Sequence, residues 1–94
     1  MALRDAYMDK LDAQLREAEA EVERLNAKAN TARADNRVEY EKQIANLKAR
    51  QEKLKEEIVS LRKAGEEAWQ DLVTGAETAW TDLRTAVRSA SQRF

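Results

Sequence analysis

Residues 68–83 read AWQDLVTGAETAWTDL, in which the pentapeptide Ala-Trp-x-Asp-Leu occurs twice, eleven residues apart. The two copies contain both tryptophans of the chain, Trp69 and Trp80. Eleven residues make three helical turns almost without drift, so equivalent residues stay on one side of a helix. Extending the step outward gives one row of side chains: Leu61, Leu72, Leu83 and Phe94. The stretch predicts a two-faced helix, and we expect the rest of the chain to be helix that packs against it or extends it.

The composition is that of long helices and coiled coils. The chain has 94 residues, no Pro and two Gly; 37% of its residues are charged and 5% are aromatic. One unbroken helix of this length would measure about 140 Å and could not bury its own apolar stripe. Partner helices must therefore come from the same chain or from another copy. We predict an all-α fold with a single coiled-coil domain over residues 1–94.

Several classes of function are disfavoured by the residues that are missing. The chain contains no His and no Cys, which removes the usual catalytic bases, nucleophiles and zinc ligands. We therefore predict no enzyme and no catalytic, cofactor-binding or metal-binding residue. A net charge of −1 argues against a nucleic-acid partner. No apolar run approaches the roughly 18 residues of a spanning helix, and the N-terminus lacks the apolar core of a signal peptide, so we expect a cytoplasmic location.

The first third of the chain carries a heptad seam, in which apolar residues recur at alternating steps of three and four. Its members are Met8, Leu11, Leu15, Ala18, Val22, Leu25, Ala29 and Ala32. The next position of the pattern is Asn36. This residue could be a buried polar group that fixes the register of a coiled coil. Alternatively, Asn36 and Glu39 have the spacing of a capping box, which would start a new helix.

A second apolar phase follows, with Gln51 filling a gap in its stripe. Its members are Tyr40, Ile44, Leu47, Leu54, Ile58, Leu61, Ala68 and Leu72, and Gly65 fills a second gap. The steps from Asn36 to Tyr40 and on to Ile44 are both four, which marks a stutter in a coiled coil. Neither Pro nor Gly occurs between residues 26 and 40. We therefore predict a long helix over about 2–62, within a heptad segment 1–63 that has a stutter near 36–44.

The segment around Gly65 is the candidate turn. Arg62 and Lys63 come before it and two glutamates follow, which suits the dipoles of one helix ending and another beginning. Gly65 itself occupies the position where a residue of positive φ often ends a helix. The apolar phase, however, passes through Gly65 undisturbed, as it would in a continuous helix. We favour the turn, and predict an amphipathic helix over about 66–94 that folds back as a helical hairpin. Within it, Gly75 is expected to permit a close helix contact.

Such a hairpin leaves the N-terminal third without a partner, and a dimer of hairpins with antiparallel long helices would supply one. We therefore predict an antiparallel homodimer or higher oligomer. The residues expected at its interfaces are Leu11, Leu15, Val22, Leu25, Tyr40, Ile44, Leu47, Leu54, Ile58, Leu61, Trp69, Leu72, Trp80, Leu83, Val87 and Phe94.

The two tryptophans allow three interpretations. They could close the edge of a helix–helix interface, which is the usual role of aromatics at helical spacing. They could anchor residues 66–94 at a lipid surface, although acidic residues outnumber basic ones in this segment. They could also form a docking face for another helical protein.

Residues 37–44 read RVEYEKQI, and together with the two Trp-bearing repeats they resemble small bacterial coiled-coil proteins of about a hundred residues. The resemblance implies a helical fold and no assigned activity. A looser similarity to exchangeable apolipoproteins and phasins rests on the eleven-residue step and on amphipathicity alone. We predict a structural, scaffolding or adaptor protein that acts by helix–helix self-association. The alternative is a protein that binds lipid or granule surfaces through residues 66–94.

Overall fold

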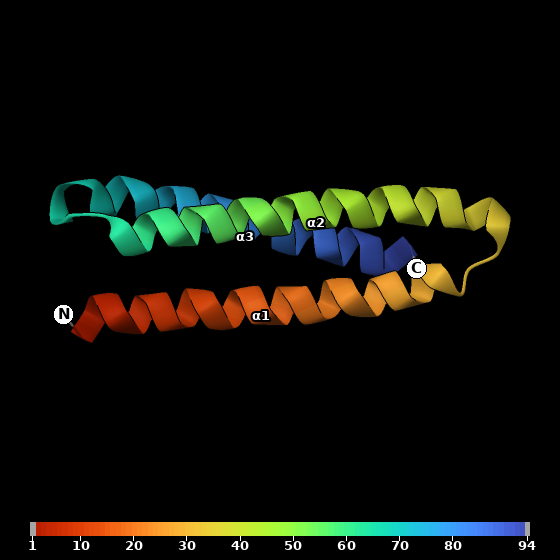
Figure 1. The fold of residues 1–94 in the computed structure, drawn as a ribbon, viewed down its shortest axis with the longest axis horizontal. Helices are drawn as coiled ribbons and strands as arrows, with labels where there is room; N and C mark the ends of the chain where they lie inside the picture. Colours follow the sequence, from red (N-terminus) through yellow and green to blue (C-terminus); the bar gives the residue numbers. More distant parts are fainter. Residues whose placement is uncertain (1, 94) are drawn as a thin grey trace.

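The computed structural model describes residues 2–93, which form a bundle of three helices (Figure 1). They are α1 (Ala2–Asn30), α2 (Ala34–Lys63) and α3 (Glu66–Arg93). Because α2 runs back along α1 and α3 reverses again, α1 and α3 are parallel. The bundle is elongated, with extents of 50 × 18 × 18 Å. The all-α, elongated architecture is confirmed, but it consists of three helices rather than a two-helix hairpin.

The predicted continuous helix over 2–62 is wrong, because the chain turns at residues 31–33. The backbone N–H groups of Thr31 and Ala32 form the last turn by donating to carbonyls of α1 at 3.2 Å. Asn30 and Thr31 both have low helix propensity, which makes a stop here inexpensive. Folding back also lets the seam of α1 bury itself against helices of the same chain. That burial outweighs the continuity of the helix.

The turn is held by side chains rather than by Gly or Pro. The guanidinium of Arg37 donates to the carbonyls of Asn30 and Ala32, both at 3.2 Å. It thereby satisfies acceptors that the end of α1 leaves free. Arg33 is the N-cap of α2, with φ −63° and ψ 152°, and its side chain makes no capping hydrogen bond.

Asn36 follows neither interpretation in full. It is exposed, so it is not a polar residue of the core. A new helix does begin nearby, but it begins at Ala34 with Arg33 as its cap. Two successive steps of four therefore mark the start of a new helix and not a stutter within one.

The second turn lies at Ala64 and Gly65, where it was predicted. Its conformation differs from the expectation, because no described glycine has a positive φ. Ala64 is the C-cap of α2 in an extended conformation, and its N–H donates to Leu61 O. Gly65 precedes α3 and its carbonyl accepts from the backbone N–H of Trp69 at 3.1 Å. Gly65 therefore belongs to the start of α3 and not to a left-handed end of α2.

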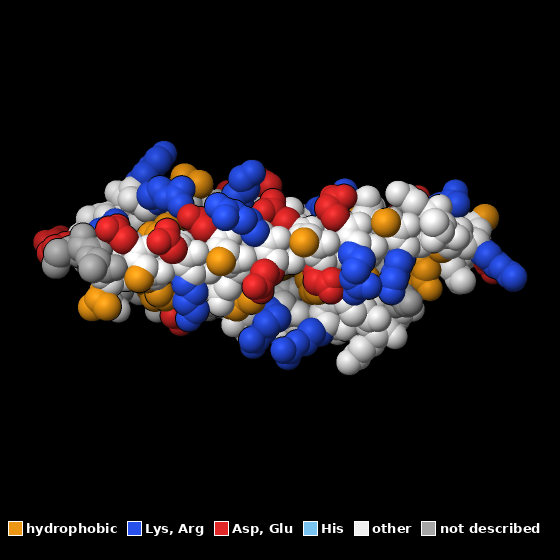
Figure 2. Space-filling model, turned by 90° about the horizontal axis from the view of Figure 1, so that it is seen from below, with side chains coloured by type: hydrophobic (Ala, Val, Ile, Leu, Met, Phe, Trp, Pro, Cys, Tyr) orange, Lys and Arg blue, Asp and Glu red, His pale blue; other side chains and the backbone are white. Residues whose placement is uncertain are grey.

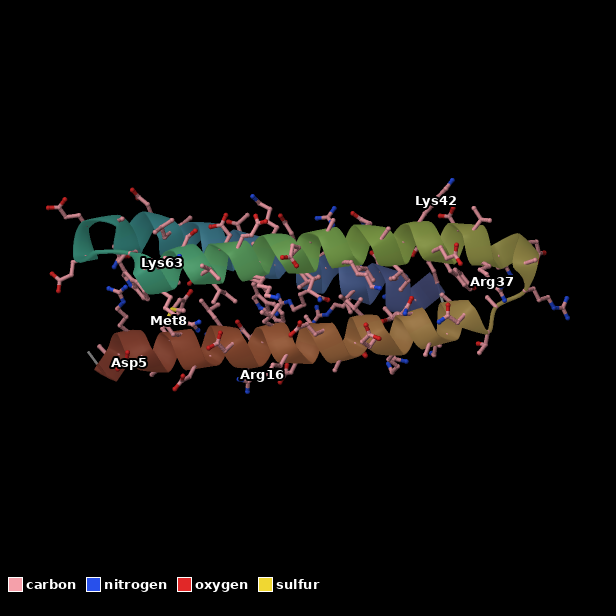
Figure 3. The ribbon with its side chains drawn as sticks, in the orientation of Figure 1. Asp5, Met8, Arg16, Arg37, Lys42 and Lys63 are labelled. Atoms are coloured by element: carbon pink, nitrogen blue, oxygen red, sulfur yellow. The ribbon has the colours of Figure 1, made fainter. Side chains whose placement is uncertain are left out.

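One apolar core runs the length of the bundle, because each helix turns its periodic stripe inward. Met8, for example, points from α1 toward α2, whereas Arg16 points away from the bundle (Figure 3). The fully buried large side chains come from all three helices: Leu11, Val22, Leu25, Leu47, Leu54, Leu61 and Leu83. Small residues of α3 complete the core, namely Ala76, Ala79 and Ala90.

The predicted close contact at Gly75 is confirmed. A Cβ atom built on Gly75 would lie 3.0 Å from Glu57 Oε2 of α2. The missing side chain thus lets the carboxylate of Glu57 approach the backbone of α3.

Candidate functional site

The residues predicted at interfaces mostly contact helices of the same chain. Ten are buried in the core of the bundle: Leu11, Val22, Leu25, Ile44, Leu47, Leu54, Ile58, Leu61, Leu83 and Val87. Five are half-buried and pack against that core: Leu15, Tyr40, Trp69, Leu72 and Trp80. Phe94 lies outside the described residues. Only the half-buried group can contact a second molecule while the bundle stays closed.

A recess with two mainly apolar hollows lies between α1 and α3. Three hollows of about 390, 360 and 460 Å³ follow one another along this seam. Tyr7 lines the first and the second, and Trp80 and Arg84 line the second and the third. The hollows therefore form one continuous recess, the α1–α3 groove, with Trp80 near its middle.

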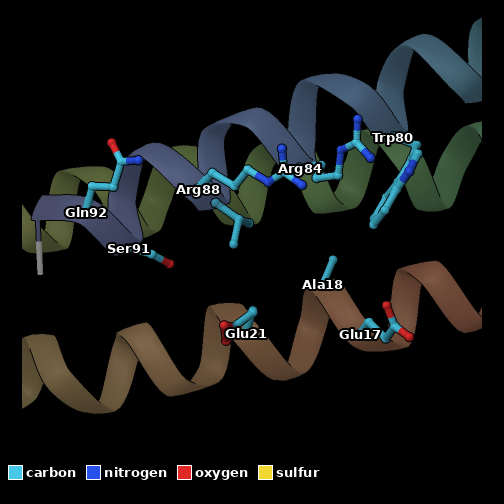
Figure 4. A pocket seen from close by; sticks show the side chains of 9 residues that line it. Glu17, Ala18, Glu21, Trp80, Arg84, Arg88, Ser91 and Gln92 are labelled. Carbon is cyan, nitrogen blue, oxygen red and sulfur yellow. The ribbon is translucent and has the colours of Figure 1, made fainter.

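Small and β-branched side chains form the floor of the third hollow. Ala18 of α1 and Trp80 of α3 point toward each other across it (Figure 4). Val87 completes the floor and is almost fully buried. A larger residue at position 18 would fill this space, so Ala18 is the residue that leaves the groove open. Trp80 keeps part of its indole at the surface, where a binding partner could cover it.

The two walls of the groove carry opposite charges, and the signs exchange along its length. At the level of the second hollow, α1 contributes Lys10 and α3 contributes Glu77, with Arg84 at the border with the third hollow. At the third hollow, α1 contributes two carboxylates, Glu17 and Glu21, and α3 contributes two guanidiniums on the other side of the groove, Arg84 and Arg88 (Figure 4). No ion pair among residues 2–93 joins the two walls. Arg24, on α1 itself, donates to Glu21 at 2.8 Å and lowers the pKa of that carboxyl.

A cluster around Trp69 lines the groove at the start of α1. The guanidinium carbon of Arg4 lies 4.3 Å from the centroid of the indole, close enough for a cation–π interaction. Tyr7 meets the same indole edge to face, with ring centroids 6.0 Å apart. Arg4 also donates to the carbonyls of Leu61 at 3.2 Å and Ala64 at 2.5 Å, which end α2. One side chain of α1 thus binds both α2 and α3.

Tyr7 adds a hydrogen bond between parallel helices, because its hydroxyl donates to Glu77 Oε1 at 2.9 Å. Partial burial, this hydrogen bond and the negative charge of Glu77 together raise the pKa of Tyr7 to about 12. The hydroxyl therefore stays protonated and keeps its hydrogen bond at neutral pH.

The sequence pattern does not identify Arg4, Tyr7 and Glu77 as members of this cluster. Periodicity identifies residues that face inward, and all three lie at the border of the apolar stripe. The sequence signal that could have indicated this cluster is Tyr7, an aromatic residue next to Met8 of the apolar seam. The contact with Trp69 depends on α1 and α3 being parallel, which follows from the turn at residues 31–33.

The apolar arc of α3 faces the core. Ala76, Leu83 and Val87 are buried beneath α1 and α2, so this arc can reach a lipid surface only if the bundle opens. None of the helices over residues 2–93 combines the length and the apolar character needed to cross a membrane. Among the same residues no group of three or more acidic side chains converges as a metal site would require.

Comparison of the chain with protein-family models, with curated proteins and with solved structures finds no match in any of the three. The similarity to small bacterial coiled-coil proteins stays an expectation from residues 37–44 and the Trp-bearing repeats.

Proposed function

We propose that this chain is a non-enzymatic scaffold or adaptor protein whose α1–α3 groove binds another helical surface. The observation that carries the proposal is the groove itself, a recess with charged walls whose first and third hollows are mainly apolar and whose middle holds a half-buried tryptophan. Binding energy at protein interfaces concentrates in a few residues, enriched in Trp and Arg, near the centre of the contact. Trp80 and Arg84 are residues of these two types, and both lie near the centre of the groove.

The other two sides of the bundle offer less apolar surface. The hollow between α1 and α2 is lined mainly by charged side chains: Arg4, Asp5, Asp9, Asp12 and Arg62. The hollow between α2 and α3 is also largely polar, with Gln43, Asn46 and Arg50 on the α2 side. Viewed from the side of α1, the outer surface mixes acidic and basic side chains, and apolar ones appear only as small patches (Figure 2). A partner therefore gains most by burying the α1–α3 groove.

The proposal is tested with Trp80 as a fluorescent reporter, in a Trp69→Phe background that keeps an aromatic ring beside Arg4. Emission is followed over a dilution series of the protein, and during titration with a designed amphipathic helical peptide. We expect a blue shift when the groove becomes occupied. Trp80→Gln, assayed by sedimentation and by labelled peptide, should weaken the association about tenfold or more.

Val59→Gln is the matched control, because Val59 is an apolar residue of α2, 42% exposed, away from the groove. It should leave association unchanged. Association that Trp80→Gln does not weaken would overturn the proposal. So would an emission shift that anionic vesicles produce and that neither self-association nor the peptide produces, since this is the outcome expected of lipid binding.

A further inference from the structure

We infer that the occupant of the α1–α3 groove is the same groove of a second copy of this chain, the two molecules being related by a twofold axis. This inference rests on the proposed function, because it names the partner that the groove binds. It is carried by the arrangement of charges on the two walls and by the size of the face.

The walls form a pattern of four charged corners. Along α1 the sign changes from positive at Lys10 to negative at Glu17 and Glu21. Along α3 it changes from negative at Glu77 to positive at Arg84 and Arg88. Lys10 and Glu77 line the second hollow, whereas Glu17, Glu21 and Arg88 line the third, so the positive and negative corners lie across the groove from each other. Arg84 lines both hollows and lies where the sign changes.

This pattern is complementary to itself. A twofold axis along the groove places α1 of one copy against α3 of the other, which brings Glu17 and Glu21 opposite the other copy's Arg84 and Arg88. An axis across the groove places α1 against α1 in opposite directions, which brings Lys10 opposite the other copy's Glu17 and Glu21. Twofold contacts use the same patch on both subunits, so a self-complementary patch is what such a dimer requires. A foreign helix would have no need of this symmetry.

The face is also large enough, and four of its charged side chains are free of ion pairs among the described residues, whereas Glu21 is paired with Arg24 and Glu77 accepts from Tyr7. A long side of the bundle measures about 50 by 18 Å, which is comparable with the roughly 800 Å² that each partner buries in a standard interface. Arg84 and Arg88 are exposed, and no ion pair among residues 2–93 involves either. Lys10 and Glu17 are likewise exposed and free of such pairs. Charges of this kind select the partner and its orientation, while the apolar floor supplies affinity.

The experiment measures dimerisation of the full chain by sedimentation equilibrium. The wild type should dimerise, more weakly at high salt because exposed charges are screened. Glu17→Lys with Glu21→Lys should weaken the dimer roughly tenfold or more, because like charges then face each other. Arg84→Glu with Arg88→Glu should do the same. Glu52→Lys with Glu56→Lys is the control, since it changes the charge equally on exposed positions of α2.

Mixing the two groove variants identifies the axis. A dimer with α1 against α3 is restored in the mixture, because every reversed carboxylate then meets a reversed guanidinium. A dimer with α1 against α1 is not restored in the mixture, but adding Lys10→Glu to the α1 variant restores it. Either restoration supports the inference. Circular dichroism confirms that each variant is folded.

Two results would overturn the inference, and both leave the proposed function open to its own test. One is a wild-type chain that stays monomeric at every concentration. The other is a dimer that responds to charge reversal on α2 as strongly as to reversal in the groove. If the chain is monomeric and yet binds the amphipathic helical peptide through Trp80, the groove has a different helical partner. The proposed function then stands and the dimer does not.

Discussion

Gln51 places an amide in the apolar stripe of α2, between the turns that carry Leu47 and Leu54. Its side-chain oxygen is buried and has no hydrogen-bond partner among the described residues. A buried acceptor left without a partner costs about 1–3 kcal/mol. Gln51→Leu removes this cost and continues the stripe of leucines. We therefore expect the free energy of unfolding to rise by about 1–2 kcal/mol, measured by urea denaturation.

The matched control is Gln43→Leu, because Gln43 is partly exposed and its amide donates to Glu39 at 3.5 Å. This change should alter stability by no more than about 0.5 kcal/mol. A destabilised Gln51→Leu variant would contradict the interpretation and would mean that the amide has a partner in solution.

At the same scale, periodicity predicts inward-facing residues well wherever a helix has neighbours along its whole length. Leu54 and Leu83 were expected inside and are fully buried. Ala68 lies on the same row as the buried Ala79 and Ala90, yet it is exposed. It belongs to the first turn of α3, beside the turn that joins α2 to α3. Periodicity in the sequence predicts which side of a helix a residue lies on. Whether that residue is buried also depends on where the neighbouring helices end.

Helix ends are where the sequence was least informative. The turn at Gly65 was predicted because the charges around it and the glycine agree. Near the turn at residues 31–33 the signal was the capping-box spacing of Asn36 and Glu39, which competed with an apolar pattern that continues toward Asn36 without a break. Arg37 stabilises this turn through two carbonyls of the preceding segment, a contact that becomes visible only once the chain has turned.

The start of α2, next to this turn, lacks a side-chain cap, so a capping residue there should increase the stability of the protein. Arg33 is the N-cap and makes no side-chain hydrogen bond to the first turn of the helix. Ser at an N-cap accepts from a free backbone N–H two or three residues later, which is worth about 1 kcal/mol. We expect Arg33→Ser to stabilise the protein by about that amount in urea denaturation. Arg33→Ala removes the same guanidinium without supplying a cap and is the control. Equal stability of the two variants would show that Arg33 is not the N-cap in solution.

On the scale of the whole molecule, one wrong helix boundary changed the predicted architecture. A long helix over 2–62 leaves the apolar seam of the N-terminal third of the chain exposed. The antiparallel oligomer was predicted because it would bury this seam. The observed α1 is covered by α2 and α3, and Met8, Leu11 and Val22 are buried within one chain. Self-association therefore no longer follows from an uncovered seam. The proposal of a dimer rests on the α1–α3 groove, whose charged walls lie on two helices that are distant in sequence.

A distance measurement separates the two architectures in solution. Arg62 Nη2 donates to Asp12 Oδ2 at 2.8 Å, although these residues are 50 positions apart in the chain. In a continuous helix the same residues would be about 75 Å apart. The chain has no Cys, so Asp12→Cys with Arg62→Cys provides two unique sites for spin labels. Losing this exposed ion pair should cost at most about 1 kcal/mol.

We expect the labelled variant, diluted with unlabelled chain so that only intramolecular pairs contribute, to give one short distance by pulsed electron paramagnetic resonance. Arg16→Cys with Lys28→Cys, both within α1, is the control, and should give about 18 Å of backbone separation in either architecture. A long distance between positions 12 and 62, with the control unchanged, would restore the continuous helix. It would also remove the α1–α3 groove, because the two walls meet only if the chain turns at residues 31–33.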